Sequence, residues 1–445
     1  MRTASSERSR GSIALFALFV AISLGIGVAD VWHYREPGPQ TSLFRLSNLV
    51  GPTAKNLLDG RGVSVCTEAM GTPGNPICFH AGRMPLATWM VALGVRLLGD
   101  DALRVNLLKM VMMLLPLEIA AWLVWLRLPQ NGVRRVWALL ILLAPFGVTV
   151  FLSDVRLMQV EEGYSYSMLA LAVAILLFAA RRGGLGVAAM LGVAVAGIYL
   201  AKSSMLPVVL VLVVGYWLLE RRTAARAMVL MLAIAAPVGW AIEQHHVSGR
   251  YSVGTSMDGL NLHKGNNAQF LERYPPPAGD SLDEFDDELK AGQDFADEWS
   301  FNDFHRKAAV NYMKAHPRET LTADARKLWV ALVSVHKIGS SAVSGVALDV
   351  EIAGLVVFRV LLWTSLAGAA WWVIRGVARE QRLAGGIFLT MVAACVLPYL
   401  AGFAYTRHVS VLIYPAALMC VRLVVCGQWS VVRGASEMGR PPHWG

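Results

Sequence analysis

The chain has 445 residues, of which 56% are hydrophobic and 16% are charged, and its mean hydropathy is +0.50. Soluble globular proteins contain about 45–50% apolar and about 25% charged residues, so this composition excludes a soluble domain, a disordered chain and a small disulfide scaffold. The net charge of +9 comes mostly from arginines beside apolar blocks, which is the pattern of membrane topology. We therefore expect an all-α polytopic membrane protein with no nucleic-acid partner.

The first apolar segment covers residues 12–29 and follows three arginines. It is about long enough to cross a hydrocarbon core of ~30 Å, whereas a signal peptide has a shorter apolar region of about 7–15 residues. Residues 1–29 are therefore predicted to form a cytoplasmic N-terminus and a retained first helix. Gly27-Val28-Ala29 also fits a cleavage site, and the residues that follow lie outside in either case.

Nine further apolar segments bring the predicted number of membrane spans to about ten. They are Arg104–Leu126, Val136–Leu152, Tyr166–Ala180, Leu185–Leu200, Met205–Leu219, Ala227–Ile242, Val350–Ile374, Gly386–Tyr405 and Val409–Val425. Residues 104–243 thus hold the second to seventh spans, and residues 350–445 hold the last three. Arginine clusters fall on alternate connections, on the side of the N-terminus. This positive-inside pattern predicts cytoplasmic termini in a bacterial inner membrane.

Two long regions are left on the outer, periplasmic side, residues 30–103 and residues 244–349. In the first, Met84–Leu98 is apolar but short, and counting it as a span would invert every later arginine cluster. We expect it to lie along the outer interface. In the second, helical spacing is predicted over Phe304–Lys314 and Leu321–Val333, with Pro317 between the two helices.

Two of the five cysteines, Cys66 and Cys78, share one polar loop of the first outer region. An oxidising compartment would favour a disulfide between them, and the alternative is two unpaired thiols. The other three, Cys395, Cys420 and Cys426, lie in or beside apolar spans, where cysteine is a small packing residue.

Ionisable residues at the outer mouths of the spans are candidate site residues. Glu161 and Glu162 open the fourth span, Lys202 ends the fifth, and Arg407 and His408 lie between the ninth and tenth. Charges near the membrane are costly, which favours a function. The cations would hold the phosphate of a lipid-linked substrate, and a carboxylate would accept a proton from a hydroxyl. The structural alternative is a charge that complements a helix dipole or extends to lipid headgroups.

Two ionisable residues lie deeper in the spans, Glu118 and Arg359. They either pair with each other or mark a polar cavity, and the sequence leaves both interpretations open. The chain has no P-loop, GxSxG, HExxH or CxxC motif, so nucleotide, hydrolase and zinc chemistries find no support. We expect no cofactor and no metal site, while a need for a divalent metal stays open.

Six segments of the chain form a series with a familiar order. They are Thr53–Ser64 followed by Gly82–Asn106, the Glu161-Glu162 pair, Leu200–Val213 with Lys202, Gly254–Phe270 with Gly-Asn-Asn, Lys314–Trp329, and Tyr405–Pro415. In this order they resemble the GT-C superfamily of membrane glycosyltransferases, most closely bacterial relatives of the protein O-mannosyltransferases and of the lipid A aminoarabinose transferase. No single motif is specific, and their collinearity carries the resemblance.

The resemblance implies catalysis at the outer face, where an acid of the first outer loop activates the acceptor hydroxyl and the sugar is transferred with inversion. The family's aspartate would fall near residues 46–48, where this sequence has no carboxylate. Asp30 or Glu36 is then the expected base, or Glu162 acts alone, or the chain is not a transferase.

The function expected from this resemblance is the transfer of a sugar from a polyprenyl-phosphate donor to a lipid, protein or polysaccharide hydroxyl. The expected substrate-binding residues are Glu161, Lys202, Arg83, Arg407, His408, Asn266 and Asn267, and the expected catalytic residues are Asp30, Glu36 and Glu162. Membrane lipids are the remaining expected partners. The alternatives are a transporter or lipid-handling protein, and a non-catalytic subunit derived from such a transferase.

Overall fold

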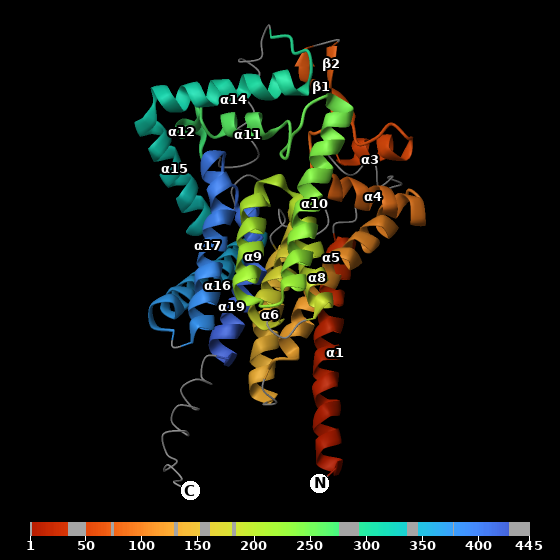
Figure 1. Cartoon of the computed structure of the whole chain (residues 1–445), viewed down its shortest axis with the longest axis vertical. Coiled ribbons are helices and arrows are strands. Elements are labelled where there is room, and N and C mark those ends of the chain that lie inside the picture. The colour runs from red at the N-terminus through yellow and green to blue at the C-terminus, as the bar shows by residue number, and fades with distance from the viewer. Residues whose placement is uncertain are drawn as a thin grey trace.

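The computed structural model describes residues 2–33, 50–72, 75–128, 132–151, 161–179, 184–275, 293–335, 346–376 and 378–426. Long helices lie side by side in a bundle, and α1 (Arg2–His33) extends to its lower end in Figure 1. Shorter helices and a β-hairpin cover the opposite end, which we call the outer end.

The bundle is built from helices that pack mainly on their neighbours in space. Their bounds are α5 Ala102–Trp125, α6 Gly132–Phe151, α7 Glu161–Ala174 continued by η2 Ile175–Ala179, α8 Leu185–Ala201, η3 Ser203–Met205, α9 Leu206–Leu219, α10 Thr223–Ser248, α16 Val346–Arg375, α17 Arg379–Ala401, α18 Thr406–Ser410 and α19 Ile413–Cys426. Helix α8 packs between α7 and α10, and α17 packs between α9 and α16. Segments about 200 residues apart are thereby brought into contact.

Four helices are long and apolar enough to cross a membrane. They are Ala102–Trp125, Thr223–Ser248, Ile352–Arg375 and Arg379–Ala401, and six shorter apolar helices accompany them. The bundle exposes large apolar side chains along its helices, as lipid-facing surfaces do, including Leu210, Val214, Val360 and Trp371. The chain is therefore a multi-pass membrane protein, and its number of spans stays a prediction.

The ten predicted apolar segments overlap described helices, with differences at the ends. Helix α1 continues to His33, so Asp30 lies in its last turn rather than in a loop. Helix α17 stops at Ala401, four residues before the predicted end of the ninth span. The tenth span is broken into α18 and α19 by a turn at Val411-Leu412. Hydropathy alone does not record these breaks, because the residues at them are as apolar as their neighbours.

The outer end is formed by both predicted outer regions. Its elements are α3 Val50–Leu58, β1 Val65–Thr72, β2 Asn75–Phe79, α4 Pro85–Leu98, α11 Asp258–Lys264, α12 Phe270–Arg273, α14 Glu298–Ala315 and α15 Pro317–Leu332. Helix α14 crosses the top of the bundle in Figure 1 and packs on α11 beneath it. The two predicted helices around Pro317 are confirmed as α14 and α15, with Pro317 at the first position of α15, where its missing N–H costs nothing.

The expectation of an all-α protein is wrong in one place. Strands β1 and β2 pair antiparallel, with Cys66 opposite Cys78, and the two cysteines form a disulfide. The polar, glycine-rich and proline-containing loop did not suggest strands, yet it folds back on itself as a hairpin. The fold is therefore a helical membrane bundle with a small disulfide-linked hairpin at its outer end.

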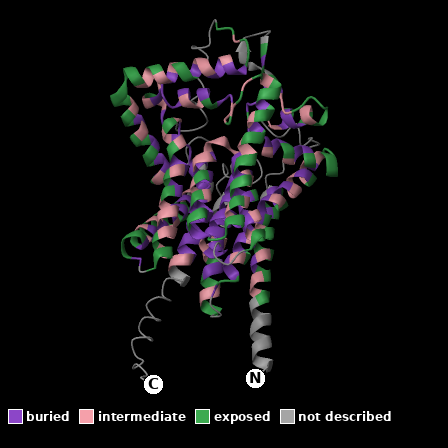
Figure 2. Cartoon of the chain, viewed as in Figure 1, coloured by how far each residue is buried: buried purple, intermediate pink, exposed green. Residues whose placement is uncertain are grey.

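Close packing holds the bundle together. Buried residues concentrate along its centre, and exposed residues on its outer faces, in Figure 2. Because lipid is as apolar as a leucine side chain, association of membrane helices depends on close contact rather than on expulsion of water. Gly192 of α8 is an example: a Cβ there would lie 2.4 Å from a side-chain carbon of Leu232 on α10. Glycine lets these two helices approach.

Candidate functional site

Three segments meet at the outer end of the bundle: the junction between α8 and α9, the end of α17, and α18. Helix α8 cannot continue into α9, because Pro207 in the first turn of α9 lacks an N–H and clashes with a preceding helical turn. Lys202 lies in this break as the residue that caps α8. The site is thus placed by two interruptions of apolar helices.

Tyr399 of α17 lies between the predicted site residues Lys202 and His408. The Lys202 ammonium is 5.6 Å from the centroid of the Tyr399 ring, and the His408 ring stacks on it at 4.5 Å between centroids. The Tyr399 hydroxyl is 3.4 Å from Ser204 Oγ, within the same break. A cation over an aromatic face is attracted by the negative charge of that face, so Tyr399 orients Lys202.

The protonation of His408 follows from its backbone neighbour. The Tyr405 N–H donates to His408 Nδ1 over 3.3 Å. An N–H group can only donate, so Nδ1 is the acceptor and carries no hydrogen. A neutral His408 then has its hydrogen on Nε2.

A second lysine, Lys264, contacts a ring that neighbours His408. The Lys264 ammonium, in the buried end of α11, is 5.8 Å from the centroid of Phe403, and the Phe403 ring is 5.4 Å from that of His408. Lys202, Tyr399, His408, Phe403 and Lys264 therefore form a continuous row, which we call the aromatic row. The row has a positive charge at each end, so it suits an anion carried by an apolar or sugar group.

The end of α17 is held by side chains of the outer region. The last carbonyls of a helix have no partner within that helix. Lys327 of α15 donates to Leu400 O over 2.8 Å, and Asn266 donates to Ala401 O over 2.6 Å. Tyr274 donates to Ala404 O over 2.5 Å. These three bonds, which we call the outer clamp, fix the connection between Tyr399 and His408.

Gly265 brings the outer region against this connection. A Cβ at Gly265 would lie 1.7 Å from Gly402 O, so only glycine fits without moving the backbone. The neighbouring Asn267 side chain donates to His263 O and Lys264 O and accepts from Gln269 N. Asn266 therefore bridges to α17, whereas Asn267 stabilises the turn itself.

Helix α11 is fixed from above by α14. The Gly259 N–H donates to Asn302 Oδ1 over 2.7 Å, and His263 Nδ1 lies 3.0 Å from His305 Nδ1. One of these imidazoles donates and the other accepts, so the two histidines differ in tautomer or charge. Burial lowers the pKa of His263 to about 4, because a charged imidazole loses its hydration there. His263 is therefore uncharged at neutral pH.

A buried carboxylate ties the first outer region to the second. Glu298, at the start of α14, accepts from His80 N, from Ala81 N and from Ser256 Oγ, at 3.1, 3.0 and 2.6 Å. The predicted site residue Arg83 follows two residues after Ala81 and is exposed. Glu298 therefore positions the segment that leads to Arg83.

The structure brings together some of the predicted site residues. Lys202, His408 and Asn266 meet at the end of α17, and Arg407 precedes His408 in α18. Glu161 and Glu162 begin α7, which contacts α18. Glu36 lies outside the described residues, and so do the side chains of Asp30, Glu161, Glu162 and Arg407. The identity of the base therefore stays a prediction.

The deep residues Glu118 and Arg359 do not pair with each other. The Arg359 guanidinium donates to the carbonyls of Val330, Ala331 and Ser334, where α15 ends. Arg359 of α16 thereby provides donors for carbonyl groups at the end of α15. Glu118 instead contacts Ser23 of α1.

Sequence reasoning missed Tyr399, Phe403, Lys264, Lys327 and Glu298. Lys264 and Lys327 lie within the segments Gly254–Phe270 and Lys314–Trp329, and for Lys264 the adjacent Gly265-Asn266 is the signal that could have included it. Tyr399 and Phe403 carried no signal, because an aromatic residue in an apolar span is ordinary. Lys327 and Glu298 lie in segments that are polar overall, where a buried charge has no sequence signature.

No group of three or more histidine, cysteine, aspartate or glutamate side chains in the described part of the chain could hold a metal ion. An apolar hollow with an empty volume of about 280 Å³ lies between η2, α9 and α17, lined by residues that include Leu177, Ile387 and Phe388. It lacks any ionisable lining residue, so it offers no chemistry comparable to the aromatic row.

No protein-family model and no curated protein sequence matches the chain. Two solved structures are similar. The oligosaccharyltransferase AglB from Archaeoglobus fulgidus, in complex with an inhibitory peptide and a dolichol-phosphate, has a TM-score of 0.47 at 10% identity over 97% of this chain and 53% of its own. ArnT from Cupriavidus metallidurans, bound to undecaprenyl phosphate, has a TM-score of 0.37 at 12% identity over 87% of this chain and 77% of its own.

This chain therefore spans about half the length of AglB. With TM-scores below 0.5, neither similarity assigns a function or a site to this chain.

Proposed function

We propose that this chain is an integral membrane glycosyltransferase that takes a sugar from a polyprenyl-phosphate donor at the outer end of its bundle. The aromatic row carries the proposal, since it has an ammonium group at each end and three rings between them. Lysine binds phosphate as a point charge, and aromatic faces cover apolar and sugar surfaces. A polyprenyl-phosphate sugar combines a phosphate, an apolar chain and a sugar in one molecule.

The donor phosphate is held in this proposal by Lys202 and Arg407, with His408 Nε2–H or Arg83 as a further donor. The acceptor oxygen attacks the anomeric carbon of the sugar, and the bond from that carbon to the phosphate oxygen breaks. Polyprenyl phosphate leaves with the electron pair, and the cations stabilise its growing negative charge. The proton of the acceptor passes to a carboxylate.

The carboxylates proposed for that step are Glu162 with Asp30 or Glu36. Glu161 and the Asn266-Asn267 turn are proposed to contact the acceptor, which is a lipid, a protein or a polysaccharide. The proposed location is the periplasmic face of a bacterial inner membrane, with both chain termini in the cytoplasm. The motif order and the arginine pattern support these details.

The first test is mass spectrometry of polyprenyl-linked lipids and surface glycans from a deletion strain and its parent. A transferase predicts that one polyprenyl-phosphate sugar accumulates and that the same sugar is lost from one glycan. If neither pool changes while the parent makes the protein, the transporter or structural alternative replaces this proposal.

The site assignment is tested by complementing that strain with Lys202→Ala and Glu162→Gln. Both variants should reach normal abundance and fail to restore the glycan. Lys314→Ala is the matched control, because Lys314 is an exposed lysine in the last turn of α14. Full restoration by Lys202→Ala and Glu162→Gln would remove these two residues from the site.

A further inference from the structure

Helix α15 belongs to a region that the sequence predicts to be periplasmic, yet its character changes along its length. Its first turn carries Arg318 and Glu319, which are both exposed. After Lys327, every residue up to Val335 is apolar except Ser334, which is buried. Three large apolar side chains of this part are exposed, those of Leu328, Trp329 and Val333. The exposed surface of α15 is therefore polar where the helix begins and apolar where it ends.

The carbonyl groups at the end of α15 all have protein donors. The last four carbonyls of a helix have no partner within it, and in α15 these belong to residues 329–332. One of them accepts from backbone N–H groups that follow the helix, and two accept from the Arg359 guanidinium over 2.6 and 3.0 Å. The fourth accepts from the Trp363 indole N–H over 3.0 Å. Water hydrates such groups at an exposed helix end, whereas in hydrocarbon each of them needs a protein donor.

These two donors of α16 lie inside an apolar span. The span begins at Ile352, and Arg359 and Trp363 follow it by about two and three helical turns. At 1.5 Å per residue, Arg359 lies roughly 10 Å inside the span. Val360 beside it is exposed, as part of the lipid-facing surface of α16. The end of α15 is therefore level with the interior of a membrane-spanning helix.

A contact with α17 indicates the same depth independently. The Lys327 ammonium donates to Leu400 O, so Lys327 is level with the outer end of α17. Helix α15 descends from α14 beside α17 in Figure 1, so the residues after Lys327 lie deeper. Residues 328–333 extend the chain by up to roughly 9 Å beyond this level. Both neighbouring helices thus place the end of α15 below the outer boundary of the spans.

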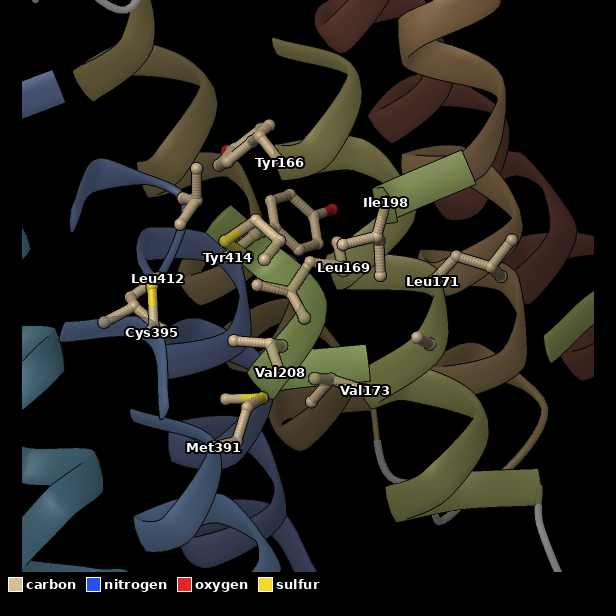
Figure 3. Close-up of a cluster of buried hydrophobic side chains, with 14 of the residues drawn as sticks. Tyr166, Leu169, Leu171, Val173, Ile198, Val208, Met391, Cys395, Leu412 and Tyr414 are labelled. Carbon is tan, nitrogen blue, oxygen red and sulfur yellow. The ribbon is translucent and has the colours of Figure 1, made fainter. Parts of the chain in front are cut away.

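Helix α15 lies at the edge of the bundle at this depth. Figure 3 shows Met391 and Cys395 of α17 in a cluster of buried hydrophobic side chains with Val208 of α9. The inner side of α17 is therefore filled, and α15 packs on α17 and α18 with Val330 and Ala331 buried. The other side of its last turns is left exposed.

We propose that the part of α15 after Lys327 lies in the hydrocarbon layer, where Leu328, Trp329 and Val333 contact lipid acyl chains. Helix α15 then enters the membrane from the outer side and ends within it. Its exposed apolar surface continues the lipid-facing surface of α16, and tryptophan is common near the ends of spans. The inference does not depend on the proposed function, and it places the outer clamp at the membrane boundary.

Spin labels in lipid nanodiscs test the proposal. The background variant has alanine in place of the three cysteines outside the disulfide, which are Cys395, Cys420 and Cys426. Leu328→Cys and Val333→Cys are then labelled separately. The relaxation of each label is compared between oxygen, which concentrates in lipid, and a water-soluble nickel complex. Both labels should give an oxygen-to-nickel ratio close to that of a label at Val360→Cys on α16.

Arg318→Cys is the matched control on the same helix, because its exposed first turn should give a low ratio. A ratio at Val333→Cys equal to that of Arg318→Cys would place the end of α15 in water and overturn the proposal. Labels at Leu328→Cys and Val333→Cys that neither reagent reaches would show that a second copy of the chain or another protein covers this surface. That outcome overturns the proposal as well.

Removing one carbonyl donor tests the surroundings of the helix end. Trp363→Phe keeps an aromatic ring but leaves Leu332 O without the indole N–H. Because water does not replace this donor in hydrocarbon, the unfolding midpoint in nanodiscs should fall by about 1–3 °C more than in Trp371→Phe. Trp371 is the matched control, since it is exposed on the same helix. Equal midpoints would mean that water hydrates the Leu332 carbonyl, which contradicts the proposal.

Discussion

At the scale of single residues, neighbours decide the chemical state of the site. His408 is a neutral donor through Nε2 because a backbone N–H occupies its other nitrogen. The Lys202 ammonium lies over the face of the Tyr399 ring. Burial lowers the pKa of Lys327, and its ammonium group donates hydrogen bonds to Leu400 O and to Asp324. Lys327 therefore stabilises a helix end, whereas Lys202 is the lysine that we propose binds the donor phosphate.

Replacing Tyr399 tests the centre of the aromatic row. Tyr399→Leu should weaken the binding of the polyprenyl-phosphate donor about tenfold, because cation–π and stacking contacts of roughly 1–2 kcal/mol are lost. Tyr399→Phe should stay within about twofold, since it keeps the ring and the contact that it loses with Ser204 is long, at 3.4 Å. The measurement is the KM for the donor in proteoliposomes. Equal losses in the two variants would show that the hydroxyl, not the ring, is what matters.

His263 predicts how stability depends on pH. Its pKa is lowered to about 4 by burial, so between pH 6.5 and 4 the unfolded chain binds a proton that the folded chain does not. Stability is thus present above pH ~6.5 and is lost as the pH falls, by about 2 kcal/mol at pH 5. Unfolding measured at pH 7 and pH 5 checks this. His263→Gln should reduce the difference between the two pH values, and an unchanged difference would contradict the assignment.

At the scale of elements, the outer clamp couples the outer region to the membrane bundle. Helix α17 ends beside the aromatic row with carbonyl groups that need partners, and α11, α12 and α15 supply them through Asn266, Tyr274 and Lys327. The connection that carries Phe403 and precedes His408 is therefore positioned from outside the bundle. A change in the outer region would reach the site through this connection.

The fit of Gly265 against Gly402 tests that coupling. Gly265→Ala should lower stability by more than about 2 kcal/mol and reduce activity, because its Cβ would overlap Gly402 O and backbone would have to move. Gly239→Ala is the control, since a Cβ there on α10 meets nothing within 4 Å. It should be neutral or slightly stabilising, by up to about 1 kcal/mol. Thermal unfolding of both variants, with the glycan assay, distinguishes the outcomes.

The hydroxyl of Tyr274 isolates one bond of the clamp. Tyr274→Phe leaves Ala404 O without its donor and should cost about 1–3 kcal/mol. Hydrogen exchange of residues 399–408 should accelerate in this variant. Tyr251→Phe, at a tyrosine that is 66% exposed, should leave both quantities unchanged. Unaltered hydrogen exchange in Tyr274→Phe would mean that the bonds from Asn266 and Lys327 are enough to hold this connection.

At the scale of the whole molecule, the arginine pattern predicts which end of the bundle faces outward. The predicted outer regions gather at one end, together with the aromatic row, and α1 extends to the other end. The number of membrane crossings and their direction then decide whether the site can meet a donor on the periplasmic face.

Cysteine labelling in intact cells checks the orientation. Lys314→Cys on α14 should react with a membrane-impermeant maleimide, and Arg221→Cys between α9 and α10 should react only after the cells are opened. Both positions are exposed, so reactivity reports the side of the membrane. The buried Cys395 and Cys420 and the disulfide-linked Cys66 and Cys78 should contribute little background. Labelling of Arg221→Cys in intact cells would invert the predicted topology.

The sequence by itself determined the features that depend on a short stretch of chain. Apolar windows marked the helices of the bundle, Pro317 separated α14 from α15, and Pro207 placed Lys202 at a helix break. Each depends on residues within a turn or two, which hydropathy and backbone chemistry describe well. The hairpin was missed, because its polar loop lacks a clear alternation of apolar residues.

Only the tertiary structure decided which residues share a site. Tyr399 joins Lys202 to His408, Asn266 and Lys327 hold the end of α17, and Glu118 meets Ser23 rather than Arg359. These residues are separated by tens to hundreds of positions in the chain. Their meeting depends on how helices pack, and apolar helix surfaces of similar composition can pack in many ways. The choice among those ways is a property of the folded bundle and not of any local pattern.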